Sequence, residues 1–212
     1  MNDKKYWTNY YATNQMPKEP STFAQFILPK LKKNKQLIEL GCGNGRDSIY
    51  FSKNGLNVHA VDQVKNEIDF LNKNFNEENI TFIAEDFTSL ENTNNKLIKN
   101  TKYDYIYSRF TFHSINEEKE NNTLDWIENN LKKEGLFLLE ARSIKDPMFK
   151  QGNTLSDTEN FTTHYRRYME LEKILKKLEL KNLKVIYKKE DKDLAVYKDD
   201  NPVVIRIIAM KE

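Results

Sequence analysis

The 212-residue sequence has little cysteine and no long apolar run. Cys42 is its one cysteine, so an intramolecular disulfide is impossible and a metal site built on cysteine is excluded. We therefore expect no bound metal. No apolar run approaches the roughly 20 residues that span a bilayer, and residues 1–5 are polar, unlike the start of a signal peptide. These absences predict a cytoplasmic protein without a membrane span.

Charge of one sign is not in excess either. The 34 basic and 32 acidic side chains leave a net charge of +2, whereas a nucleic-acid footprint usually needs a clear basic excess on one face. We therefore expect no nucleic acid among the partners. Hydrophobic residues make up 38% and charged residues 31% of the sequence, which is the composition of a globular domain. The length predicts one domain, residues 1–212, and the oligomeric state stays open.

Strand and helix patterns alternate along most of the chain. Strand patterns lie at residues 36–40, 57–61, 80–84, 103–107 and 136–141, with helical patterns between them at 47–54, 64–75 and 117–131. A helix around 171–178 is then followed by strands at 185–187 and 203–209. This order predicts an α/β fold with a single Rossmann-like, doubly wound sheet, mostly parallel with an antiparallel C-terminal edge.

Two segments lie outside this alternation. Residues 1–35 contain a helix that Ser21 would cap and a cluster of aromatic side chains that would cover the cofactor or the sheet edge. The aromatic residues are Tyr6, Trp7, Tyr10 and Tyr11. Residues 143–163 resemble neither helix nor strand. A polar loop this long is often a lid, and the alternative is a solvated insertion.

The most specific motif is a glycine loop. Its sequence, Glu39-Leu40-Gly41-Cys42-Gly43-Asn44-Gly45, follows a predicted strand and precedes a predicted helix. Glycine allows a tight turn and a close approach of the backbone to a ligand. Asp62 ends the next strand, about 20 residues further on, where a carboxylate accepts hydrogen bonds from ribose hydroxyls. The spacing predicts a site for an adenosine-containing cofactor.

Two charged residues at the loop favour S-adenosylmethionine over a dinucleotide. Arg46 stands where a dinucleotide fingerprint has Gly or Ala. Glu39 adds negative charge, which disfavours a pyrophosphate but suits the cationic sulfonium and amino groups of S-adenosylmethionine. Cys42 is expected to pack within the loop and not to act as a nucleophile.

Residues 39–45, with Asp62 and Asp86, resemble class I S-adenosylmethionine-dependent methyltransferases. The resemblance covers roughly residues 36–141. It implies the seven-stranded methyltransferase fold, S-adenosyl-L-methionine as cofactor and S-adenosyl-L-homocysteine as product. The glycines would pass under the methionine part, Asp62 would hold the ribose, Asp86 and Phe87 would flank the adenine, and Ser108 would lie near the methionine end. The implied cofactor-binding residues are Glu39, Gly41, Cys42, Gly43, Gly45, Arg46, Asp62, Gln63, Asp86, Phe87 and Ser108.

Two further resemblances concern the acceptor. Residues 45–48, Gly-Arg-Asp-Ser, resemble the small tellurite- and thiopurine-type methyltransferases. Residues 165–168 and 201–206 look more like methyltransferases associated with bacterial capsule and surface-polysaccharide assembly. The second resemblance implies a phosphorylated or sugar-containing acceptor.

Acceptor-binding residues are expected at the carboxyl ends of the strands. Arg109 and Arg142 follow the fourth and fifth strands. The helix around 171–178 is expected to begin at residues 164–167, and helical spacing then turns Arg167 toward the cleft. Because arginine forks bind phosphate or carboxylate, we expect these three arginines to converge on an anion.

The candidates fall into two groups. The catalytic candidates are His113, His164, Arg109, Arg142 and Arg167, and the acceptor-binding candidates are Tyr6, Trp7, Tyr11, Tyr165 and Arg166. Either histidine is suited to take a proton from an acceptor hydroxyl. The alternatives are structural: an arginine paired with a carboxylate such as Glu140, or a histidine satisfied in the core or on the surface. Arg206 is expected at the surface.

These observations favour an S-adenosylmethionine-dependent enzyme that O-methylates a phosphorylated or sugar-containing precursor of a surface glycan. A detoxifying methyltransferase acting on a small thiol or a chalcogen oxyanion is the second hypothesis. A non-catalytic protein that binds the cofactor and a partner is the third. The expected ligands are the cofactor and a small-molecule or nucleotide/sugar-phosphate acceptor.

Overall fold

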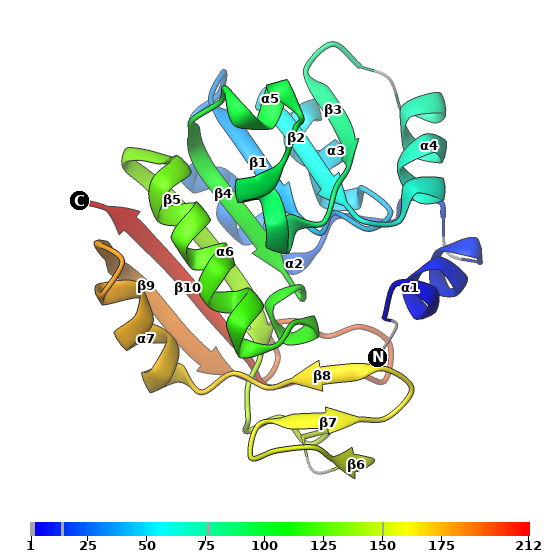
Figure 1. The fold of residues 1–212 in the computed structure, drawn as a ribbon, viewed down its shortest axis with the longest axis vertical. Helices are drawn as coiled ribbons and strands as arrows, with labels where there is room; N and C mark the ends of the chain where they lie inside the picture. The colour runs from blue at the N-terminus through cyan, green and yellow to red at the C-terminus, as the bar shows by residue number, and fades with distance from the viewer. Residues whose placement is uncertain (1–2, 14, 76, 150) are drawn as a thin grey trace.

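The computed structural model describes residues 3–13, 15–75, 77–149 and 151–212. Seven strands form one sheet in the order β3-β2-β1-β4-β5-β10-β9 (Figure 1). Their bounds are β1 Gln36–Leu40, β2 Asn57–Asp62, β3 Ile80–Ala84, β4 Tyr103–Arg109, β5 Leu131–Arg142, β9 Leu183–Asp191 and β10 Val204–Lys211. Strands β1 to β5 pair in parallel, and β10 is antiparallel to both β5 and β9. The predicted sheet, with its antiparallel C-terminal edge, is confirmed.

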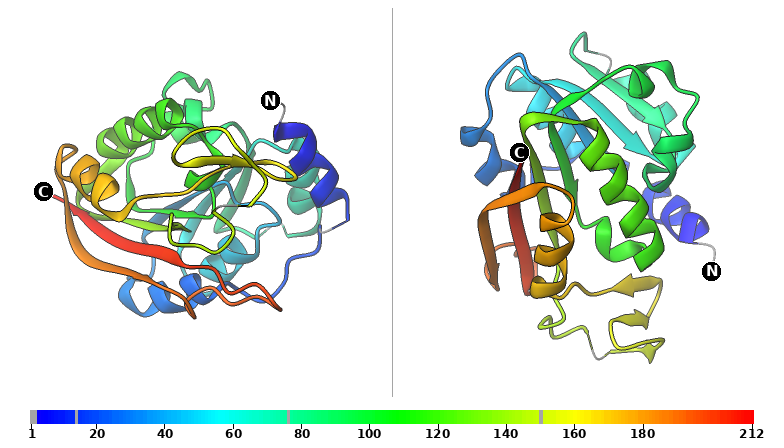
Figure 2. Two further views of the ribbon diagram at one scale, coloured as in Figure 1. Left: turned by 90° about the horizontal axis from the view of Figure 1, so that it is seen from below. Right: turned by 60° about the vertical axis from the view of Figure 1, so that its left-hand side comes forward.

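Helices cover both faces of this sheet (Figure 2). The α-helices are α1 Asp3–Ala12, α2 Thr22–Ile27, α3 Arg46–Lys53, α4 Lys65–Asn74, α5 Lys96–Lys99, α6 Glu117–Asn130 and α7 Leu171–Glu179, and the 3-10 helices are η1 Leu28–Lys30, η2 Phe87–Asn92 and η3 Phe112–Ser114. Trp126 of α6 and Ile174 of α7 pack in one apolar cluster, and Phe23 of α2 and Phe51 of α3 pack in another. The sheet is therefore buried on both faces, as a parallel sheet requires.

The segment before α7 differs from its prediction. Strands β6 Asn153–Thr154 and β7 Glu159–Phe161 lie within the expected lid, and β7 pairs with β8 Tyr165–Arg167 to give a small antiparallel sheet. The prediction that residues 143–163 contain neither helix nor strand is wrong, and so is the helix start at 164–167. The backbone of residues 165–167 is held by β7, and α7 begins only at Leu171.

The crevice of the fold lies where the strand order reverses. The chain runs from β1 outward to β2 and β3, then returns to place β4 on the other side of β1. The connections after β1 and β4 leave in opposite directions, and ligands of open α/β sheets bind at such a point. The glycine loop follows β1 directly, so it lies at this position.

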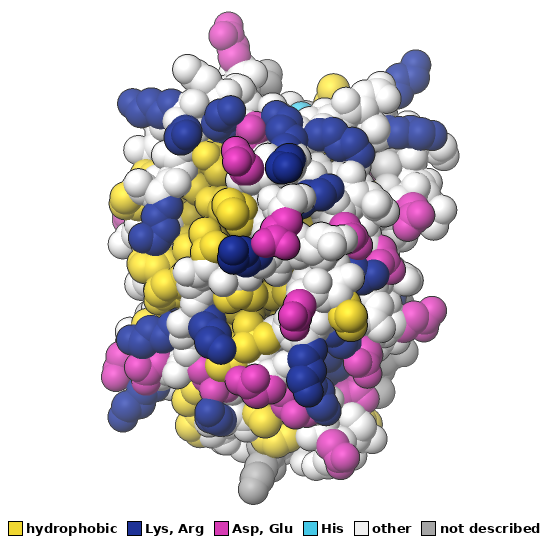
Figure 3. Space-filling view, turned by 90° about the vertical axis from the view of Figure 1, so that its left-hand side faces the viewer, with side chains coloured by type: hydrophobic (Ala, Val, Ile, Leu, Met, Phe, Trp, Pro, Cys, Tyr) yellow, Lys and Arg dark blue, Asp and Glu magenta, His cyan; other side chains and the backbone are white. Residues whose placement is uncertain are grey.

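The surface carries no dominant charge on the face drawn in Figure 3. Basic and acidic side chains are interspersed there around an apolar area (Figure 3). Over the described residues, no helix combines the length and apolarity that crossing a bilayer needs.

Candidate active site

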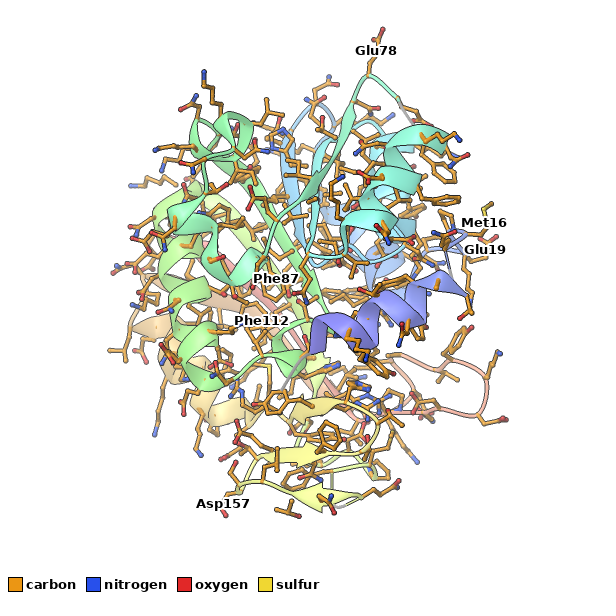
Figure 4. All side chains as sticks on the ribbon, turned by 45° about the vertical axis from the view of Figure 1, so that its right-hand side comes forward. Met16, Glu19, Glu78, Phe87, Phe112 and Asp157 are labelled. Atoms are coloured by element: carbon orange, nitrogen blue, oxygen red, sulfur yellow. The ribbon has the colours of Figure 1, made fainter. Side chains whose placement is uncertain are left out.

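A cavity of about 340 Å³ lies at the carboxyl ends of the central strands. Its walls come from α1, the glycine loop, the end of β2, the loop between β4 and α6, the end of β5, the segment leading into β8, and the loop between β9 and β10. In Figure 4, α1 lies between the main sheet and the small sheet of β6 to β8. Segments distant in sequence therefore meet at one site.

The glycine loop needs glycine for its backbone angles and for space. Gly41 and Gly43 have φ values of 77° and 54°, in the region that favours glycine. A Cβ added to Gly41 would lie 2.3 Å from Cγ2 of Thr111, and one added to Gly43 would lie 2.2 Å from the hydroxyl oxygen of Tyr11. Gly45 does not line the cavity and serves as the N-cap of α3. The absence of side chains therefore lets Thr111 and Tyr11 pack against the loop, while Gly41 and Gly43 line the cavity.

Asp62 fixes the other side of this cradle. Its Oδ2 accepts a hydrogen bond from the Gly43 N–H at 3.0 Å, and its Oδ1 accepts one from the Val64 N–H at 2.9 Å. Burial raises the pKa of Asp62, and these two hydrogen bonds oppose that rise. The carboxylate is thus oriented, and Asp62 lines the cavity together with the neighbouring Gln63. A carboxylate in this position fits the predicted hydrogen bonds to ribose hydroxyls.

Glu39 supplies a buried carboxyl beneath the glycine loop. Burial raises its pKa, as does the nearby Asp47 carboxylate, while the Ser48 hydroxyl donates a hydrogen bond to it. Asp47 is itself held by the Ser21 N–H at 2.7 Å. A cationic group bound beside Glu39 would favour its ionised form. The buried Glu39 carboxyl therefore fits the positively charged amino and sulfonium groups of S-adenosylmethionine.

Three other expected cofactor residues differ in their placement. Phe87 lines the cavity. Asp86 does not; it caps η2, because its Oδ1 accepts from the Thr88 N–H at 2.9 Å. Ser108 is fully buried and bonded to the Thr111 hydroxyl. Ser108 is thus linked to the cavity through Thr111, which lines it. The cofactor contacts of all the candidate residues stay predictions.

Aromatic side chains of α1 form one wall of the cavity. These side chains are Tyr6, Trp7, Tyr10 and Tyr11. The Tyr6 ring stacks on His164, with ring centroids 4.2 Å apart. The wall therefore joins the glycine loop, through Tyr11, to the segment leading into β8, through His164.

Besides Arg46 at the start of α3, three arginines line the same cavity: Arg109, Arg142 and Arg166. Nε of Arg109 donates to Oε1 of Glu140 at 2.8 Å. Nη1 of Arg142 donates to Asp146 at 2.9 Å, and Nη1 of Arg166 donates to the Thr162 hydroxyl at 2.9 Å. The structure thus places three guanidinium groups around one volume.

Three further residues do not lie where the sequence predicted them. Arg167 is not at the cavity, because its guanidinium pairs with the buried Glu120 and donates from Nε to the Ile115 carbonyl at 3.1 Å. The expected convergence of Arg167 with Arg109 and Arg142 is therefore wrong. Tyr165 also lies outside the cavity. Arg206 is buried beside Glu140, with 2.6 Å between Nε and Oε2, so its predicted surface position is wrong.

Both candidate histidines line the cavity in neutral form. Burial lowers the pKa of His113 well below its ordinary value, and the Arg142 and Arg166 charges add to this. Burial and Arg166 lower the pKa of His164 to about 4. Among the described residues, Nδ1 of His113 is buried without a hydrogen-bond partner. A neutral imidazole can accept a proton from an acceptor.

Several cavity residues were not among the candidates. Phe110, with a φ of 58°, holds its ring 4.2 Å from the Arg109 guanidinium, and Thr111 follows it. Both come directly after β4, so the rule of carboxyl strand ends points to them. Tyr197 and Asp200 line the cavity from the loop between β9 and β10. No local sequence pattern signals that contact, because it forms across the fold.

The chain resembles known proteins in sequence. It matches the model of a family described as a methyltransferase domain over residues 12–186. Over 114 residues it is 32% identical to a probable S-adenosyl-L-methionine-dependent methyltransferase, TehB, of Haemophilus influenzae, a match covering 54% of this chain and 36% of that protein. The chain thus aligns with about a third of the length of this curated relative.

Solved structures share the fold at lower identity. A methyltransferase of Clostridium acetobutylicum has a TM-score of 0.70 at 18% identity, covering 100% of this chain and 99% of that one. The 1,6-didemethyltoxoflavin-N1-methyltransferase of Burkholderia thailandensis has a TM-score of 0.67 at 16% identity, covering 89% and 76%. With its doubly wound sheet, glycine loop and family match, the chain belongs to the family of methyltransferase domains.

Proposed function

We propose that the chain methylates a small anionic acceptor that binds among Arg109, Arg142 and Arg166. One observation carries the proposal: these guanidinium groups line the same cavity as the glycine loop and two neutral histidines. Guanidinium groups bind phosphate, carboxylate and other oxyanions through charge-assisted hydrogen bonds. An anion held there would be close to the cofactor cradle.

The chain's own residues divide the work of binding. Gly41 and Gly43 give the cofactor an open backbone, Asp62 accepts from its ribose, and Glu39 balances its cationic end. When bound, S-adenosylmethionine supplies an electrophilic methyl group on a positively charged sulfur. Transfer of that group depends mainly on alignment and proximity. The arginines and the aromatic wall of α1 are proposed to fix the acceptor in line.

The acceptor atom decides whether a base takes part. An acceptor hydroxyl or thiol must lose a proton, and His113 or His164, which both line the cavity, would be the base. A phosphate oxygen is already ionised and needs no base. The arginines would then bind the other oxygens of the group and leave the attacking one free.

Two acceptor classes follow from the resemblances. We favour a phosphorylated or sugar-containing precursor of a surface glycan, because of the likeness at residues 165–168 and 201–206. A small thiol or chalcogen oxyanion is the second candidate, because of the likeness at residues 45–48.

Transfer of labelled methyl from S-adenosylmethionine to a panel from both classes tests the proposal, with Arg166→Ala and Arg167→Ala as a matched pair. Arg166→Ala should weaken acceptor use by about 10-fold or more, the value of a charge-assisted hydrogen bond, with little change in S-adenosylhomocysteine affinity. Arg167→Ala removes one of the two cations that pair with buried Glu120 and leaves Lys177, so it should cost about 1–3 kcal/mol of folding stability instead.

Equal loss of acceptor use and of cofactor affinity in Arg166→Ala would contradict the assignment. Cofactor binding by the wild type without transfer to any acceptor would select the non-catalytic alternative.

A further inference from the structure

Arg142 is held by two carboxylates that differ in exposure. Nη1 donates to Oδ2 of Asp146 at 2.9 Å, and the side chains of this pair are 7% and 1% exposed. Nη2 pairs with Asp200, whose side chain is 42% exposed and which lines the cavity. Asp146 is therefore a fixed internal partner of Arg142. Asp200 reaches the same guanidinium from the side of the solvent and the acceptor.

A tight turn sets the position of Asp200. The Tyr197 N–H donates to the Asp200 carbonyl at 2.9 Å, and the Asp200 N–H donates back to the Tyr197 carbonyl at 3.0 Å. The Tyr197 hydroxyl accepts a hydrogen bond from Nζ of Lys18 at 3.0 Å. The turn is thus tied to the segment that follows α1, and its carboxylate is held at the mouth of the cavity.

The charges around the acceptor region nearly cancel. Arg109 and Arg206 share the single carboxylate of Glu140, and Arg142 has two carboxylates. Arg166 has no carboxylate within ion-pair distance among the described side chains, and its burial lowers its pKa. Counted over these arginines and the carboxylates that pair with them, four guanidinium groups and three carboxylates leave one positive charge. Two further cations line the cavity: Nε of Arg46 lies 3.9 Å from Asp47, and Nζ of Lys18 donates to the Tyr197 hydroxyl. The neutral histidines add none.

We propose that Asp200 is a specificity-determining residue that limits the bound group of the acceptor to a single negative charge. The inference rests on the proposed function and narrows its substrate class to a phosphodiester, a carboxylate or a singly ionised oxyanion. A dianion bound at Nη2 of Arg142 would lie next to the Asp200 carboxylate, which pairs with the same nitrogen. The two negative charges would repel each other. Without the Asp200 charge, the region would carry two positive charges and would accept a dianion.

Sulfamate and sulfate test this, because the two tetrahedral anions are similar in size and carry one and two negative charges. Their apparent dissociation constants are measured from thermal shifts of the full chain saturated with S-adenosylhomocysteine, at constant ionic strength. Wild type should bind sulfamate more tightly. Asp200→Asn should tighten sulfate binding by about 10-fold, the effect of one removed like charge in a partly buried site, and should reverse the order. The neighbouring, exposed Asp199→Asn makes the same charge change away from Arg142 and should alter neither.

An unchanged sulfate affinity in Asp200→Asn would overturn the inference, as would an equal gain in Asp199→Asn. Wild-type preference for sulfate would also overturn it. In each case S-adenosylhomocysteine binding and labelled methyl transfer are measured separately. If the wild type showed neither S-adenosylhomocysteine binding nor methyl transfer, the proposed function would be contradicted. If it showed both, but Asp200→Asn had the same anion preference as the wild type, only the role of Asp200 would be removed.

Discussion

At the scale of single residues, Gly41 shows how closely the cofactor loop is packed. An added Cβ there would lie 2.3 Å from Cγ2 of Thr111, and Thr111 is fixed by its hydrogen bond to buried Ser108. Gly55 has a similar left-handed backbone, with a φ of 89°, but an added Cβ would lie 3.4 Å from the flexible Lys33 side chain. Both glycines need a left-handed backbone conformation, but only at Gly41 would an added side chain also clash with a neighbouring residue.

Gly41→Ala should therefore lower S-adenosylhomocysteine affinity by more than about 10-fold, because the loop or Thr111 must move. Both Gly41→Ala and Gly55→Ala should lose about 1–2 kcal/mol of stability from left-handed strain. Calorimetric titration and denaturant unfolding measure the two effects. Gly55→Ala is the control, and cofactor affinity reduced equally by both variants would assign the effect to backbone strain.

At the scale of elements, α1 closes the cavity by packing on α4. Glu67, in the first turn of α4, is 1% exposed. Burial raises the pKa of its carboxyl to about 7, with a contribution from the Asp62 charge. Since the folded state holds a proton that the unfolded chain releases near pH 4.5, the stabilisation from this group is complete below that pH and is lost as pH rises through about 7.

Glu67→Gln should reduce the fall of the melting temperature between pH 5.5 and pH 8, because the amide stays neutral throughout. Thermal unfolding of wild type and variant across this range measures the difference. Glu78→Gln makes the same change at an exposed position in the α4–β3 connection and should retain the wild-type slope. A Glu67→Gln slope equal to that of the wild type would show that this carboxyl does not hold its proton.

At the scale of the whole molecule, the main sheet and the cofactor loop were predictable because their signals are contiguous. A strand, three glycines and a helix lie within residues 36–53, and each later strand repeats a local pattern. The small sheet of β6 to β8 was missed because its strands are two or three residues long and exist only by mutual pairing. Arg206 was misplaced because its partner Glu140 stands opposite it on β5, 66 positions away.

Cofactor binding should stabilise the molecule as a unit, because the cavity joins α1, the sheet ends and the β9–β10 loop. At about 100 times its dissociation constant, S-adenosylhomocysteine should add about 2.7 kcal/mol. For a domain of this size that corresponds to a rise of about 5–10 °C in melting temperature. NAD at the same concentration should give little rise, because its pyrophosphate would lie near Glu39 and Asp62. An equal rise with NAD would contradict the electrostatic argument for the sulfonium cofactor, and no rise with S-adenosylhomocysteine would contradict the cradle itself.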